Sequence, residues 1–122
     1  MLVEGILKPR SLDQKLGWFA ATFDNDISKY YSKLSGIPWR SPMNGVHATL
    51  IAGQHELRII TDTEMLPFIN STISCYTNGI VWTNTESFWM DVISNDLDLI
   101  RKELKLPSRK FHLTLGNLKN AT

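Results

Sequence analysis

The chain has 122 residues, 43% of them hydrophobic and 20% charged, a composition that indicates one folded domain and argues against disorder. Its 13 basic and 12 acidic residues give a formal net charge of +1 and form no basic run, so a long duplex nucleic acid is not an expected partner. The single cysteine, Cys75, excludes an intrachain disulfide, and no apolar window approaches the ~18 residues of a membrane helix. We therefore expect a cytoplasmic protein with one domain over residues 1–122 and no membrane partner, either a monomer or a small homo-oligomer.

The first half of the chain predicts a strand, a helix and a second strand. The apolar run at residues 17–23 (GWFAATF) is typical of a buried strand. Asp26 is placed as the N-cap of a helix in which apolar residues recur at helical spacing, and Gly36 is placed to end that helix. A loop follows with Trp39, which we read either as a lid over a base or as a ring packed on the core. Residues 46–52 (VHATLIA) then predict the second strand.

The middle of the chain combines weak patterns with one strong turn signal. Residues 54–60 are predicted to be extended, and residues 63–69 to form a short, interrupted helix. Within residues 72–83, the dipeptide Asn78-Gly79 predicts a hairpin turn between two strands, because both turn positions need a positive φ.

The last part of the chain repeats the strand-helix-strand order of the first half. Residues 87–93 (SFWMDVI) predict a strand, Ser94 or Asn95 is placed to cap a helix that Pro107 stops, and residues 110–118 (KFHLTLGNL) predict the final strand. Two β-α-β units therefore flank the middle section, which indicates an α+β fold.

The pattern His-x-Thr occurs on two of these predicted strands. His47 and Thr49 share one face of their strand, as do His112 and Thr114, because strand side chains alternate between faces. One imidazole can deprotonate a nucleophile while another protonates a leaving oxygen near neutral pH, and the hydroxyls can donate to phosphate oxygens. This quartet predicts a phosphodiesterase site that needs no metal and no cofactor. The alternative is that each histidine is only a structural residue of its strand.

The paired motifs HATL and HLTL resemble the H-x-T/S-x signature of the 2H phosphoesterase superfamily, in an order that extends over residues 17–118. That superfamily includes RNA 2′,3′-cyclic phosphodiesterases, 2′,5′-oligoadenylate phosphodiesterases and the phage anti-CBASS enzymes that destroy cyclic nucleotide signals. The resemblance implies a two-lobed, pseudo-twofold LigT-like fold of antiparallel sheets flanked by helices. In that fold, the two motif strands face each other across a cleft.

The same resemblance implies roles for individual residues. His47 and His112 would be the acid and the base, and Thr49 and Thr114 would hold the phosphate. By similarity to the phage enzymes, Phe19 and Trp82 are the expected base-stacking contacts, although aromatic residues in strands are more often part of the core.

Several functions are compatible with these residues. The first is a hydrolase that cleaves a 3′-5′ or 2′-5′ linkage in a small cyclic or oligomeric nucleotide, with viral immune evasion of the anti-CBASS type, in the host cytoplasm, as its setting. The second is a 2′,3′-cyclic phosphodiesterase that acts on RNA ends or nucleotides. The third is a non-catalytic nucleotide-binding module, and the fourth is a structural protein in which both motifs are coincidental.

Overall fold

Six antiparallel strands form a closed barrel in which the order around the barrel is β1-β2-β3-β6-β5-β4. The computed structural model describes residues 1–9, 19–42, 45–51, 56, 59–84 and 86–117. The strands are β1 (Leu2–Pro9), β2 (Phe19–Thr22), β3 (His47–Ile51), β4 (Thr72–Thr83), β5 (Ser87–Ile93) and β6 (Phe111–Asn117). The α+β class is therefore confirmed. The strands belong to one closed barrel, where separate antiparallel sheets were expected.

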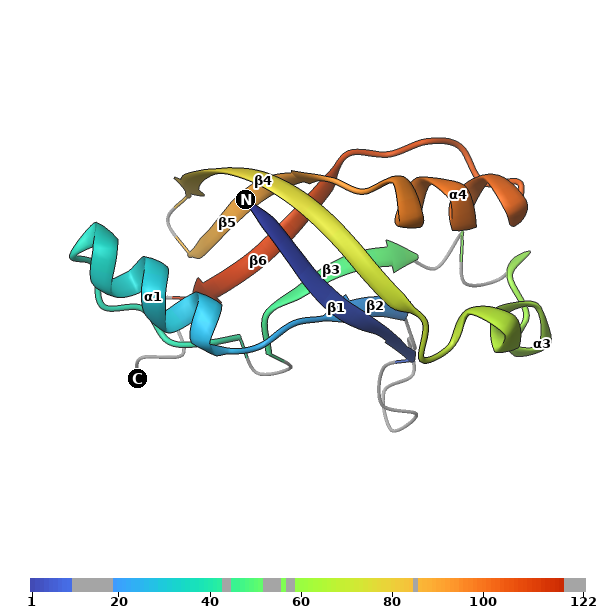
Figure 1. Ribbon diagram of the computed structural model, residues 1–122, viewed down its shortest axis with the longest axis horizontal. Helices are drawn as coiled ribbons and strands as arrows, with labels where there is room; N and C mark the ends of the chain where they lie inside the picture. Colours follow the sequence, from blue (N-terminus) through green and yellow to red (C-terminus); the bar gives the residue numbers. More distant parts are fainter. Residues whose placement is uncertain (10–18, 43–44, 52–55, 57–58, 85, 118–122) are drawn as a thin grey trace.

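Helices lie at two opposite ends of this barrel (Figure 1). One end carries α1 (Asp26–Ser35), and the other carries α3 (Asp62–Met65) with the 3₁₀ helix that follows it (Leu66–Phe68), together with α4 (Asn95–Glu103). The longer helix α4 buries Leu97 and Ile100, as the spacing of its apolar residues predicts. For α1 the prediction holds only in part, because two of its apolar residues, Tyr30 and Leu34, are exposed. Among the helices described, none has the length and apolar character needed to cross a membrane.

The core fills the barrel because alternate residues of each strand point inward. The inward side chains of the motif strands, Ala48 and Leu50 on β3 and Leu113 and Leu115 on β6, are all 0% exposed. Cys75 is also fully buried, as free cysteines often are. Apolar packing therefore fixes the inner face of both motif strands and turns their histidines outward.

Trp39 belongs to this core and not to a lid. Its ring stacks on Phe88 with centroids 4.4 Å apart, and its indole Nε1 donates a 2.9 Å hydrogen bond to the hydroxyl of Ser28 on α1. The residue is 8% exposed, so the prediction of a ring packed on the core is confirmed and the prediction of a lid is wrong.

The two halves of the chain have equivalent places in the barrel. Each half supplies two strands, a helix and a third strand, as β1-β2-α1-β3 and as β4-β5-α4-β6. Exchanging the halves maps the strand order onto itself, so β2 is equivalent to β5 and β3 to β6. The motif strands β3 and β6 are therefore neighbours at the junction of the two halves.

Two strand predictions are wrong, for local physical reasons. The first strand, β1, was missed, because its outward residues Leu2 and Ile6 are apolar and hide the period-2 alternation. The hairpin at Asn78-Gly79 is instead a bulge within the continuous strand β4: Gly79 uses its positive φ of 78°, and the register with β5 shifts there. The chain turns later, after Thr83.

Three smaller predictions concern helices. The N-cap of α1 is Asn25 and not Asp26. Oδ1 of Asn25 accepts a 3.0 Å hydrogen bond from the backbone N–H of Val46, and this bond connects the start of α1 to the residue before β3. The extended segment expected at 54–60 is wrong where it is described, since Glu56 and Ile59 are helical. The cap of α4 is confirmed, because the Ser94 hydroxyl accepts from the N–H of Leu97.

Candidate functional site

The two His-x-Thr motifs lie side by side on the outer face of the barrel. Strands β3 and β6 pair antiparallel with His47 opposite Thr114, and the same register brings Thr49 level with His112. In such a pair, diagonal neighbours are roughly 7–8 Å apart, which brings both imidazoles within reach of one phosphate. The structure therefore gathers the predicted quartet. The motif strands, however, are neighbours in one barrel instead of facing each other across a cleft.

His47 is held by the loop that precedes its own strand. Its Nδ1 lies 2.8 Å from the carbonyl oxygen of Gly45. A carbonyl only accepts, so Nδ1 carries the proton and the lone pair of the neutral ring is on Nε2. Gly45 has a φ of 80°, a conformation that favours glycine, and this turn aims its carbonyl at the ring.

His112 is held by a carboxylate on the neighbouring strand. Its Nδ1 lies 2.9 Å from Oδ1 of Asp91, the residue directly opposite it on β5, and Nζ of Lys110 lies 3.2 Å from the other oxygen. Partial burial raises the pKa of Asp91, but the hydrogen bonds and charges of Lys110 and His112 outweigh this effect and hold the pKa below its usual value. Asp91 is therefore an ionised acceptor at neutral pH.

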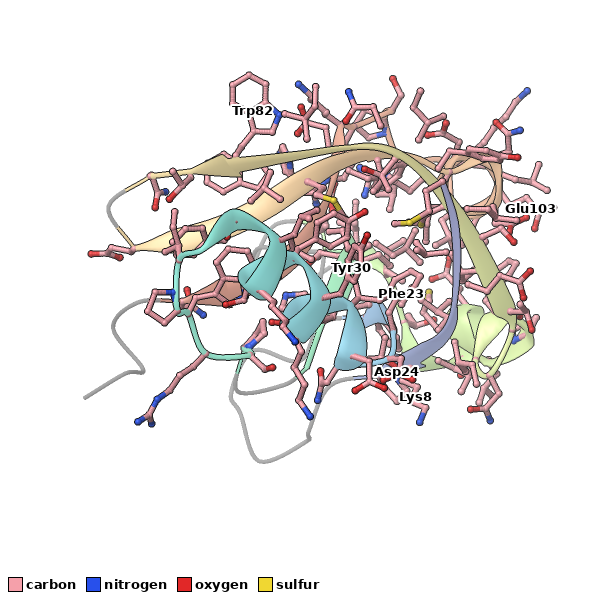
Figure 2. The ribbon with its side chains drawn as sticks, turned by 60° about the vertical axis from the view of Figure 1, so that its left-hand side comes forward. Lys8, Phe23, Asp24, Tyr30, Trp82 and Glu103 are labelled. Atoms are coloured by element: carbon pink, nitrogen blue, oxygen red, sulfur yellow. The ribbon has the colours of Figure 1, made fainter. Side chains whose placement is uncertain are left out.

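A row of side chains crosses the barrel surface through this site. Pairing along the row runs from Thr22 on β2 to His47, then to Thr114, to Trp89 on β5 and to Trp82 on β4. We call this set the cross-strand row. Its last member, Trp82, is 50% exposed and projects away from the barrel (Figure 2). The quartet is thus continuous with an aromatic surface on the β5 side.

Trp89 and Asp91 are site residues that the sequence analysis missed. The ring of Trp89 lies edge-on to that of His112, with centroids 6.1 Å apart and planes at 80°. Both residues alternate with the buried Phe88 and Met90, so the pattern of β5 already placed them on the outer face. What the pattern did not supply is the pairing of β5 with β6, which brings them to His112.

Phe19 lies apart from the cross-strand row. It is 8% exposed and packs in the core, and a register shift beside it separates it from Thr22, the residue that β2 contributes to the row. The face of β2 next to the motifs is therefore small and non-aromatic, whereas the equivalent face of β5 carries Trp89 and Asp91. We do not include Phe19 in the proposed ligand contacts.

A family model described as the Swiss Army Knife, 2H phosphoesterase domain (2H-SAK) matches residues 23–121, a span that contains both motifs and most of the barrel. No curated protein and no solved structure matches the chain.

Proposed function

Because the chain belongs to the 2H phosphoesterase family, we propose that it is a metal-independent phosphodiesterase that hydrolyses a small cyclic or oligomeric nucleotide. Phosphodiesterase-type activity is what the family indicates. The observation that carries the proposal is the pairing of β3 with β6, which sets each imidazole beside the hydroxyl of the opposite strand on one outer face. In addition, both rings are held through Nδ1 by an oxygen of the protein, so Nε2 is the ring atom that we propose for proton transfer.

The proposed reaction needs only proton transfers and hydrogen bonds from this chain. One imidazole accepts the proton of the attacking oxygen, which belongs to water or to a neighbouring ribose hydroxyl, as that oxygen bonds to phosphorus. The bond to the leaving ribose oxygen breaks, its electron pair stays on that oxygen, and the other imidazole protonates it. Thr49 and Thr114 donate to the non-bridging oxygens, where negative charge is greatest.

A nucleotide is favoured as the substrate because aromatic rings continue the site. Trp89 and Trp82 follow Thr114 along the cross-strand row, and an indole face can stack a base without regard to its identity. Cleavage of a 3′-5′ or 2′-5′ linkage in a cyclic or short oligonucleotide fits this surface. The biological setting we propose is viral evasion of nucleotide-signalled immunity of the CBASS type in the host cytoplasm, which the resemblance of the motifs supports.

A second candidate function is the opening of 2′,3′-cyclic phosphates on RNA ends or nucleotides. The observation in its favour is that the His112 side chain is 45% exposed on an outer barrel face, where the end of a longer strand has access. The formal charge of +1 argues against tight binding of a long RNA, because such affinity grows with the number of phosphates neutralised.

The two candidates predict different products from one substrate panel. The chain is incubated with cyclic dinucleotides, 2′,5′-oligoadenylate and a 2′,3′-cyclic nucleotide, with and without EDTA, and the products are separated by chromatography. We expect cleavage of a cyclic or oligomeric nucleotide at the same rate in both conditions. Loss of activity in EDTA contradicts the metal-independent mechanism. Binding of the panel without any product indicates instead a nucleotide-binding module.

Removal of the indole rings is expected to weaken substrate binding more than it slows the chemical step. Each stacked base contributes ~1–3 kcal/mol, so Trp82→Ala and Trp89→Ala should each raise KM by about 5- to 150-fold with a smaller change in kcat. Steady-state kinetics on the substrate found in the panel measures this split. Tyr76→Ala, which removes another exposed aromatic ring from β4, is the matched control and should leave KM unchanged.

A further inference from the structure

We propose that Arg101 is a positioning residue that sets the spacing between Thr49 and His112, which form one half of the quartet. This role rests on the proposed function, since both residues belong to the site described there. The register of β3 with β6 ends at Ala48 and Leu113, and among the described residues of these strands no pair continues to Thr49 and His112. The two side chains are level with each other, but they lie beyond the end of the backbone ladder.

The two halves of the quartet are therefore held in different ways. The equivalence of the two halves of the barrel relates the pair of His47 and Thr114 to the pair of His112 and Thr49. The first pair lies within the ladder, whose hydrogen bonds keep neighbouring strands roughly 4.7–4.9 Å apart. Thr49 and His112 are each paired to an outer neighbour, on β2 and β5. A contact other than the ladder therefore has to fix the spacing between them.

The side chain of Arg101 reaches from α4 to the chain on both sides of this junction. Its Nη1 donates a 2.7 Å hydrogen bond to the carbonyl oxygen of Leu50, the residue after Thr49 on β3. Its Nε donates a 2.9 Å hydrogen bond to the carbonyl oxygen of Pro107, in the segment that leads into β6. In a ladder, the amide of one strand meets the carbonyl of the next directly. Here a guanidinium stands between two carbonyls and joins the two segments.

The guanidinium is buried and held on every side that contacts it, so it can act as a rigid spacer. The side chain of Arg101 is 2% exposed, and both oxygens of Glu56 accept from Nη1 and Nη2 at 3.0 and 2.7 Å. The fork is planar, so these bonds also fix its orientation. The backbone closes on the same residue, since the N–H of Leu106 donates to the carbonyl of Arg101 at 2.9 Å. A change in the guanidinium is therefore transmitted to both carbonyls that it joins.

The chemical consequence is confined to one half of the site. A displaced clamp moves Thr49 relative to His112, whereas the ladder still holds His47 beside Thr114. The indole rings that we propose as base contacts lie on β4 and β5, away from the bonds of the guanidinium. Loss of the clamp should therefore slow the chemical step and leave substrate binding nearly intact, because the geometry of the reacting groups is what changes.

Arg101→Lys tests the clamp, because lysine keeps the charge but offers a single ammonium in place of the planar fork. On the substrate found in the panel, we expect kcat per folded molecule to fall by about 10- to 100-fold with KM nearly unchanged. Glu56→Gln is the control for stability: it weakens the ion pair but leaves both carbonyl contacts of the guanidinium, so it should lower the melting temperature and retain kcat. Lys102→Met, at an exposed position on the same helix, should alter neither.

Combined variants distinguish a change of spacing from a general loosening of the barrel. In the Arg101→Lys background, Thr49→Val should reduce kcat by a much smaller factor than in the wild-type chain, because Thr49 is already displaced. Thr114→Val should reduce kcat by the same factor in both backgrounds, because the ladder holds Thr114. Circular dichroism gives the folded fraction of each variant. Where Arg101→Lys does not fold, Glu56→Asp takes its place, since the shorter carboxylate keeps the ion pair but draws the guanidinium away from the two carbonyls.

Each contrary result points to a specific error. An unchanged kcat in folded Arg101→Lys, or the same dependence on background for Thr49→Val and Thr114→Val, overturns the positioning role while leaving the phosphodiesterase intact. A fall of kcat in Glu56→Gln as large as that in Arg101→Lys also overturns it, because stability and not spacing then accounts for the loss. A wild-type chain that cleaves no member of the panel overturns the proposed function, and the role of Arg101 with it.

Discussion

Replacing either motif histidine, in His47→Ala or His112→Ala, is expected to reduce kcat for the phosphodiester by about 10²–10⁴-fold, which is the usual contribution of general acid–base catalysis. Both rings lie on the outer face of the barrel and contribute no packing to its core, so each variant should still fold. The double variant should be little worse than either single one, because a concerted acid–base pair loses most of its effect with its first member.

The measurement combines steady-state kinetics with thermal unfolding of the same samples. Tyr30→Ala removes an exposed ring of α1 that belongs neither to the quartet nor to the cross-strand row, and this variant should retain full activity. A decrease of less than about fivefold in either histidine variant would contradict the catalytic assignment. A large fall in melting temperature together with the loss of activity would instead indicate that the ring supports the fold.

The motif strands could be predicted from the sequence because their information is local. VHATLIA and KFHLTLGNL alternate between apolar side chains and imidazole or hydroxyl groups, and this period alone places both histidines on an outer face. Because the same motif occurs on one strand in each half of the sequence, we could also predict that the two motif strands share one site. The structure adds the register, with His47 opposite Thr114.

The supporting residues could not be predicted because they depend on contacts between distant segments. Asp91 contacts His112 only because β5 pairs with β6. Likewise, the orientation of His47 depends on the positive φ of Gly45. Gly79 shows the opposite case: a local turn signal was present, but the surrounding strand continued and used the same φ in a bulge. The sequence patterns thus indicated which side chains face outward, but they did not indicate which strands are neighbours in the barrel.

The buried guanidinium of Arg101 gives the largest expected effect on stability, although no sequence pattern marked it. The side chain is 2% exposed, and its nitrogens bind both carboxylate oxygens of Glu56, at 3.0 and 2.7 Å, and the carbonyls of Leu50 and Pro107, at 2.7 and 2.9 Å. Arg101→Met is therefore expected to lower the free energy of unfolding by about 3–5 kcal/mol, because it withdraws the cation from a partly buried carboxylate and a donor from the buried carbonyl of Leu50.

Urea denaturation of Arg101→Met beside Lys102→Met, an exposed neighbour on the same helix, measures this difference. Arg101→Lys keeps the charge but not the planar fork, so it should fall between Arg101→Met and the wild-type chain. A loss below about 1 kcal/mol for Arg101→Met would show that the ion pair contributes no more than a surface pair. Because the carbonyl of Leu50 belongs to β3, the strand that carries His47, we also expect catalysis by the folded Arg101→Met fraction to be reduced. That effect would link the helix at one end of the barrel to the geometry of the imidazole on its face.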